Sequence, residues 1–153
     1  MCVPHIDIFL TSIPGIGGFL LYSTRRNIHR ISLDAYNMES VIPKINDEEI
    51  THLGTYYKHD SIFWVDNFKD KQQTRAIKTA FLNGSNEKVV ISAGFYGPVH
   101  GLAIDWIAGN VYWTQPFLNR VEVSKLDGRY RRTIVHSQIQ FMPRWLAVNP
   151  HIW

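Results

Sequence analysis

A short aromatic segment recurs along this chain, and its spacing limits the possible folds more than any other feature. Ile62-Phe63-Trp64-Val65-Asp66 matches Val111-Tyr112-Trp113-Thr114-Gln115 position by position. Tyr22 and Trp153 are two further anchors, and subtraction of residue numbers gives intervals of 42, 49 and 40 residues between successive anchors. These segments are rich in residues that favour β-strands. A four-stranded unit that repeats at about this period is typical of a β-propeller blade.

The turns between the expected strands recur in step with the anchors. Leu33-Asp34-Ala35, Leu82-Asn83-Gly84 and Leu126-Asp127-Gly128 each follow an expected strand and contain turn-forming residues. Apolar residues alternate with small or polar ones from 102 to 106, and Gly109-Asn110 then signals a hairpin. These patterns predict an all-β fold of four-stranded antiparallel blades. The alternative is a β-sandwich in which the similarity between segments is coincidental.

The same patterns set the expected boundaries. Residues 1–18 are predicted to be an irregular N-terminal lead-in, because Pro14 and the glycines at 15, 17 and 18 interrupt the apolar residues there. Residues 19–153 are predicted to form the blades. The expected strands cover 19–23, 27–34, 39–42, 50–57, 62–66, 74–82, 87–92, 102–106, 111–114, 120–124, 132–136 and 143–150.

The residues around Trp113 resemble the YWTD repeat of the low-density-lipoprotein receptor family. The resemblance is carried by Asn110-Val111-Tyr112-Trp113-Thr114, by the preceding Gly101-Leu102-Ala103-Ile104-Asp105-Trp106, and by Leu126-Asp127-Gly128. Asp66 keeps the aspartate that ends the motif, whereas Gln115 stands in its place in the next copy. Related propellers occur in the epidermal growth factor precursor and in nidogen. Within the family, the lipoprotein-receptor-related proteins look most similar.

This resemblance implies a propeller of six blades, which needs roughly 250 residues at this period. The chain is therefore expected to hold about three of the six blades, as the N-terminal half of a propeller, and to be a fragment or an incomplete gene model. In the family the motif aspartate helps to tie neighbouring blades through backbone hydrogen bonds. The resemblance assigns structural roles to the repeat residues Trp64, Asp66, Asp105, Trp106, Tyr112, Trp113, Thr114 and Gly128.

The resemblance also implies a function. Such propellers are non-enzymatic protein-binding modules of endocytic or signalling cell-surface receptors, which dock protein ligands on one rim or help to release them in acidic endosomes. The implied partners are protein ligands and neighbouring cysteine-rich modules, and the implied location is extracellular or at the cell surface. Two alternatives remain open, a six-bladed propeller hydrolase and a nidogen-like matrix-linking protein.

Composition narrows the function classes further. A formal charge of +3 is too small to indicate nucleic-acid binding. Cys2 is the only cysteine, which leaves no internal disulfide and no cysteine-rich metal site. The N-terminal residues lack a basic start and an uninterrupted apolar stretch, and we recognise neither a signal peptide nor a membrane span in the sequence.

The sequence shows no catalytic motif, but it offers a candidate glycosylation site and two candidate pH-sensing histidines. The seven histidines show no metal-binding spacing, and neither a nucleophile elbow nor a phosphate-binding loop is present, so we predict no catalytic residue, metal or cofactor. Asn83-Gly84-Ser85 is an N-glycosylation sequon on an expected turn. His100 and His136 lie near expected turns and are candidate pH sensors, because imidazole titrates near endosomal pH.

Overall fold

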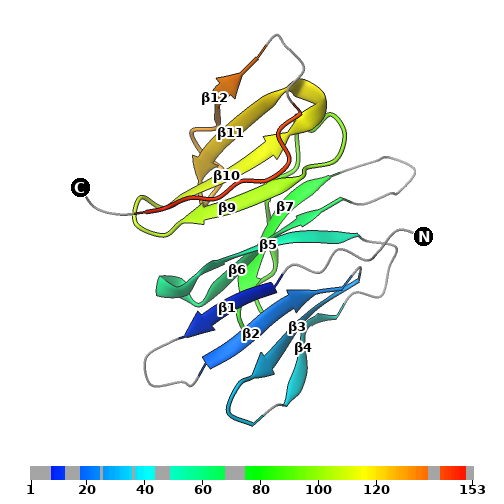
Figure 1. The fold of residues 1–153 in the computed structure, drawn as a ribbon, viewed down its shortest axis with the longest axis vertical. Coiled ribbons are helices and arrows are strands. Elements are labelled where there is room, and N and C mark those ends of the chain that lie inside the picture. Colours follow the sequence, from blue (N-terminus) through cyan, green and yellow to red (C-terminus); the bar gives the residue numbers. More distant parts are fainter. Residues whose placement is uncertain are drawn as a thin grey trace.

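The computed structural model contains three four-stranded antiparallel sheets, each built from consecutive strands (Figure 1). It describes residues 8–12, 18–24, 26–35, 37–43, 49–67, 75–137 and 142–150. Blade A consists of β1 (Ile8–Ser12), β2 (Gly18–Ser23), β3 (Asn27–Ser32) and β4 (Met38–Pro43); blade B of β5 (Ile50–Tyr56), β6 (Ser61–Asp66), β7 (Ala76–Phe81) and β8 (Lys88–Ile91); and blade C of β9 (Gly101–Asp105), β10 (Asn110–Gln115), β11 (Arg120–Lys125) and β12 (Arg132–His136). The predicted all-β fold of four-stranded antiparallel blades is confirmed.

The blades stack side by side, with their first strands closest together. In Figure 1 blade A lies below blade B and blade C above it, and β5 contacts β1 on one side and β9 on the other. Two 3-10 turns, η1 (Tyr57–His59) and η2 (Pro116–Leu118), complete the secondary structure of the described residues. Neither is long or apolar enough to span a bilayer.

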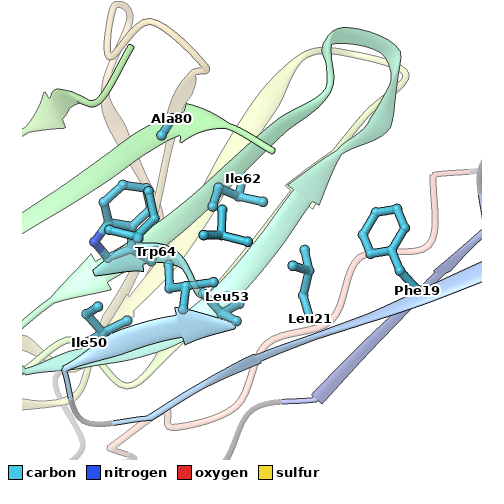
Figure 2. Close-up of a cluster of buried hydrophobic side chains, with 10 residues drawn as sticks. Phe19, Leu21, Ile50, Leu53, Ile62, Trp64 and Ala80 are labelled. Carbon is cyan, nitrogen blue, oxygen red and sulfur yellow. The ribbon is translucent and has the colours of Figure 1, made fainter. Parts of the chain in front are cut away.

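Each interface between blades holds its own hydrophobic cluster. Figure 2 shows the first cluster, in which Phe19 and Leu21 of blade A face residues of blade B that include Leu53 and Trp64. The second cluster lies between blades B and C and contains Phe63 and Val65 of β6. Because side chains alternate along a strand, β6 buries one set of residues in each cluster. The apolar character of both faces of these strands follows from this arrangement.

The three blades share an irregularity that fixes their correspondence. The register of the third strand against the fourth shifts after Ile28 in blade A, after Ile77 in blade B and after Val121 in blade C. In each blade, the residue that follows the shift pairs with an anchor on the second strand. These pairs are Tyr22 with His29, Trp64 with Lys78 and Trp113 with Glu122. Tyr22 therefore occupies the position of the two tryptophans, and Trp153 lies outside the described residues.

Two expectations from the sequence need correction. The lead-in over residues 1–18 is not irregular throughout, because Ile8–Ser12 form β1 and pair with β2, which itself begins at Gly18. Five residues are enough for the first strand of a blade, so prolines and glycines on either side do not exclude one. Residues 143–150 form no strand, since no ladder among the described residues includes them; they run as the red segment beside blade C in Figure 1.

Candidate functional site

Asp105 and Trp106 lie at the hairpin turn between β9 and β10. The Asp105 carboxylate accepts hydrogen bonds from the backbone N–H groups of Ile107 and Ala108, both at 2.9 Å. Gly109 closes the turn at φ +65° and donates to the Asp105 carbonyl at 3.0 Å. Trp106 is half-buried, with its ring 6.1 Å from that of Tyr57. Asp105 therefore shapes the turn, as an Asx motif does.

Gly128 lies where the turn of one blade presses on the preceding blade. Its φ is +84°, and a Cβ atom there would meet the Val90 carbonyl oxygen of β8 at 2.3 Å. Gly84 repeats this contact one blade earlier, with φ +80° and the Val41 carbonyl oxygen of β4 only 2.0 Å from the point that a Cβ would occupy. Glycine is required at both positions by the left-handed backbone and by the close approach of the neighbouring strand.

Blades B and C are joined through the side chain of Asn67. Its Nδ2 donates to the Val99 carbonyl at 3.1 Å, and its Oδ1 accepts from the Val99 N–H at 3.1 Å. Nδ2 also donates to Thr51 Oγ1 at 2.9 Å. The amide thus satisfies both backbone groups of a buried residue in the segment that leads into β9. Sequence analysis missed this residue, because it directly follows the repeat motif and has no counterpart in blade C, where Pro116 stands.

Thr114, like Asn67, donates a side-chain hydrogen bond to a backbone carbonyl of a segment outside the strands. Its Oγ1 donates to the Arg144 carbonyl at 3.4 Å, and Thr114 is fully buried. Gly101, at the start of β9, lies so close to this segment that an added Cβ would be 2.7 Å from the same carbonyl oxygen. Residues 142–146 therefore pack on β9 and β10 although they form no strand.

The motif aspartate and its replacement have different partners. Asp66 is buried and forms an ion pair with Lys78 at 2.7 Å. Lys78 pairs with Trp64 across the strands, and the equivalent residue opposite Trp113 is Glu122. In blade C the amide of Gln115 donates to the Glu122 carboxylate. The buried carboxylate is therefore on the second strand in blade B and on the third strand in blade C. In blade C, Gln115 on the second strand supplies the neutral donor to it.

Glu122 is the centre of a largely buried network. Its carboxylate accepts from Trp113 Nε1 at 3.1 Å and pairs with Arg131 at 2.8 Å. Arg131 also donates to the carbonyls of Ala93 and Gly94, in the segment between blades B and C. Its guanidinium lies 5.2 Å from the Trp113 ring centroid, a cation–π distance. The network therefore ties β11 and the residue that precedes β12 to the connection between blades B and C. Tyr112, on the opposite face of β10, is half-buried and accepts from Asn110 Nδ2 at 3.4 Å.

One end of blades B and C collects exposed aromatic residues, and we call it the η2 edge. It comprises residues 92–100, 116–120, 136–137 and 142–146, at the end of the strands where β10 passes into β11. Tyr96, Phe117 and Trp145 are 70%, 56% and 67% exposed. Phe117 packs over Gly97, next to Tyr96, since an added Cβ on that glycine would be 2.5 Å from the Phe117 ring.

The two candidate pH sensors lie at this same edge. His100 immediately precedes β9, and His136 ends β12, where it pairs with Arg120 at the start of β11. His136 is exposed and His100 is half-buried. In the sequence each of them lies near a separate expected turn, and the strand register brings both to one end of blade C.

The opposite end of the blades carries the sequon. Asn83 is exposed and lines a cleft of about 360 Å³ between blades A and B, with Phe19, Arg30 and Phe81 among the other lining residues. Asp127 holds the equivalent position in blade C. The pKa of its carboxyl is lowered by a hydrogen bond from the backbone N–H of Arg129, then by the Arg129 side chain. Among the described residues, no cluster of three or more histidine, cysteine or acidic side chains could hold a metal ion.

Comparison with known proteins agrees with this architecture. No protein-family model matches the chain. The chain is 36% identical over 133 residues to low-density lipoprotein receptor-related protein 5 of Mus musculus, a match that covers 86% of this chain and 8% of that relative. The chain thus spans a small part of that protein.

Solved structures show the same fold. A chain of a nidogen/laminin complex superposes with a TM-score of 0.68 at 22% identity, over 84% of this chain and 46% of that one. An oligogalacturonate lyase in complex with manganese superposes with a TM-score of 0.63 at 10% identity, over 77% of this chain and 37% of that one. Together with the anchors, the turns and the sequence match, they lead to one conclusion: the chain belongs to the YWTD β-propellers of the low-density lipoprotein receptor family.

Proposed function

We propose that this chain is a non-enzymatic protein-binding module of an endocytic or signalling cell-surface receptor. Its similarity to a receptor-related protein over 86% of its length supports a receptor-type propeller. In a propeller, ligand contacts come from the loops at the ends of the blades, because the strands themselves are buried between neighbours. Its ligands are proteins, its covalent neighbours are cysteine-rich modules, and its location is extracellular.

The observation that carries this proposal is the aromatic surface of the η2 edge. Tyr96, Phe117 and Trp145 come from three different segments, and each exposes more than half of its surface. Tyrosine, tryptophan and phenylalanine are enriched at protein interfaces, and tyrosine and tryptophan are frequent among the residues that dominate the binding energy. Three such side chains on one edge therefore favour a protein partner over a small molecule.

A substitution at this edge tests the proposal. The purified chain would be applied to an array of purified extracellular protein domains, in parallel with the variants Tyr96→Ala and Tyr57→Ala. Tyr57 is a matched control, because it is 48% exposed but lies at the opposite end of the blades. An interface residue of this type contributes about 2 kcal/mol or more. Binding should fall roughly 30-fold with Tyr96→Ala and remain with Tyr57→Ala.

Two outcomes would contradict the proposal. If no domain binds the chain, or if both tyrosine variants bind as well as the parent, the η2 edge is not a protein-binding surface. Hydrolysis of a substrate by the purified chain would support the enzymatic alternative instead.

The same partner allows a test of pH dependence. His100 and His136, which both lie at the η2 edge, are the predicted pH sensors, so the affinity would be compared at about pH 7.4 and about pH 5.5. We expect the affinity to differ between these two pH values, and the difference to shrink when both histidines are replaced by asparagine. Equal affinities at the two pH values, measured by titration calorimetry, would rule out a sensing role for this pair.

A further inference from the structure

The turn that carries the sequon has a defined geometry. Phe81 N–H donates to the Ser85 carbonyl at 2.9 Å, and Gly84 N–H donates to the Phe81 carbonyl at 2.8 Å. Gly84 has a φ of +80°. This is a type I turn followed by a glycine bulge, a common three-residue hairpin connection. The turn places Phe81 two residues before Asn83, at the position where the hairpin closes.

Asn83 is available for modification. The residue is exposed, and its Oδ1 accepts from the N–H and the hydroxyl of Ser85 at 3.0 and 2.6 Å. Those bonds leave Nδ2, the atom that would carry a sugar, directed away from the turn's own hydrogen bonds. Asn83 itself is exposed, whereas Gly84 in the same turn lies against the Val41 carbonyl.

Phe81 offers a surface for that group. Its side chain is 41% exposed and lines the same cleft as Asn83, between blades A and B. One face of a pyranose ring carries mainly C–H groups, and such a face packs on an aromatic ring through burial of apolar surface. An aromatic side chain and a sugar-bearing asparagine on one side of a tight turn are therefore complementary.

We propose that Asn83 is N-glycosylated and that its first sugar packs on Phe81, which stabilises the β7–β8 hairpin. A lipid-diphosphate-linked oligosaccharide is the donor. The bond between Asn83 Nδ2 and the sugar C1 forms while the bond from C1 to the phosphate oxygen breaks. The lipid diphosphate leaves with the electron pair, and one amide proton passes to the solvent. This inference rests on the proposed extracellular location, because the transfer takes place in the secretory pathway.

Blade C provides a matched control for the aromatic ring. Its turn has the same hydrogen bonds, from Lys125 N–H to Arg129 O at 2.9 Å and from Gly128 N–H to Lys125 O at 2.8 Å. Lys125 occupies the place of Phe81, and Asp127 that of Asn83. The double substitution Asp127→Asn with Arg129→Ser therefore creates a second sequon on the same turn without the aromatic partner.

The first measurement is occupancy. The full chain would be secreted from mammalian cells behind an added cleavable signal peptide, so that the result does not depend on the receptor role. Its intact mass would be compared with that of Asn83→Gln. We expect the parent to carry one oligosaccharide that the variant lacks. An unmodified Asn83 in the secreted chain would overturn the proposal, whether or not the chain binds a protein ligand.

The second measurement is hydrogen exchange of residues 76–91, by mass spectrometry. Three forms would be compared: the full glycan, the single sugar left by an endoglycosidase that cleaves between the first two sugars, and the unmodified chain from bacteria. We expect exchange in the hairpin to be about 2- to 10-fold slower in both sugar-bearing forms, the range for a contact with an aromatic ring.

The variants decide whether Phe81 is responsible. The protection from the sugar should disappear in Phe81→Ser, where forms with and without sugar are compared in the same variant. It should also be absent at the sequon created in blade C. Equal protection with and without Phe81, or no protection in the parent, would overturn the proposed contact.

Discussion

Substitution of Gly128 by alanine should destabilise the contact between blades B and C. The residue has a φ of +84°, and the added Cβ would lie 2.3 Å from the Val90 carbonyl oxygen. The left-handed backbone alone costs a non-glycine residue ~1–2 kcal/mol. Displacement of the turn from β8 adds ~1–3 kcal/mol, the usual effect of overpacking a close contact. We therefore expect a total loss of about 2–5 kcal/mol in the free energy of unfolding.

Gly109 separates the two contributions. It also has a positive φ, of +65°, but the nearest atom to an added Cβ is Leu126 Cδ1, at 4.0 Å. Gly109→Ala therefore carries the backbone cost without the clash. Unfolding in urea, followed by the fluorescence of the buried Trp64 and Trp113, measures both variants under the same conditions.

The comparison can refute the reasoning. We expect Gly128→Ala to lose ~1–3 kcal/mol more than Gly109→Ala, a difference in urea midpoint on the order of 1 M. If the two midpoints agree within error, the approach of the turn to β8 contributes nothing to stability. The close contact between the blades would then not require glycine at position 128.

Three further predictions concern single side chains. Asn67→Ala should cost ~1–3 kcal/mol for each backbone group of Val99 left without a partner, seen as a lower urea midpoint. Glu122→Gln should cost about 3 kcal/mol, because Arg131 loses the carboxylate partner of a largely buried ion pair, and an unchanged midpoint would contradict the network. Asp127 contributes stability above pH 3.8, its ordinary pKa, and that contribution is lost as the pH falls through its lower folded-state pKa. Asp127→Asn should therefore weaken the fall in thermal midpoint between about pH 5 and 3.

Much of the fold could be predicted from the sequence because its signals are local. Alternation of side chains identified the strands, and the anchors at Tyr22, Trp64 and Trp113 identified the repeat. The register shift that all three blades share supports the equivalence of these anchors. Turn chemistry is equally local: Asp105 bonds to residues two and three positions further on. A pattern that depends on neighbours within a few residues is preserved in the sequence itself.

The N-terminal strand shows where local reasoning fails. Ile8–Ser12 have no long alternating pattern, and the nearby proline and glycines favour irregular structure. They form β1 because β2 offers a complete row of backbone partners. Residues 143–150 show the opposite case, since their apolar pattern predicted a strand that forms no ladder among the described residues. Both outcomes depend on whether a neighbouring strand offers pairing, and the sequence of a single segment does not specify this.

Contacts between blades were decided only by the tertiary structure. Asn67 bonds to a residue 32 positions away, and Arg131 reaches a carbonyl 38 positions away. The gathering of His100 and His136 at the η2 edge likewise depends on the register of blade C. Apart from residues 8–12 and 143–150, the sequence determined which segments become strands and turns, because those preferences act over a few residues. The stacking of the blades determined which polar side chains meet, because a shift of register by one residue would send each of them to the other face.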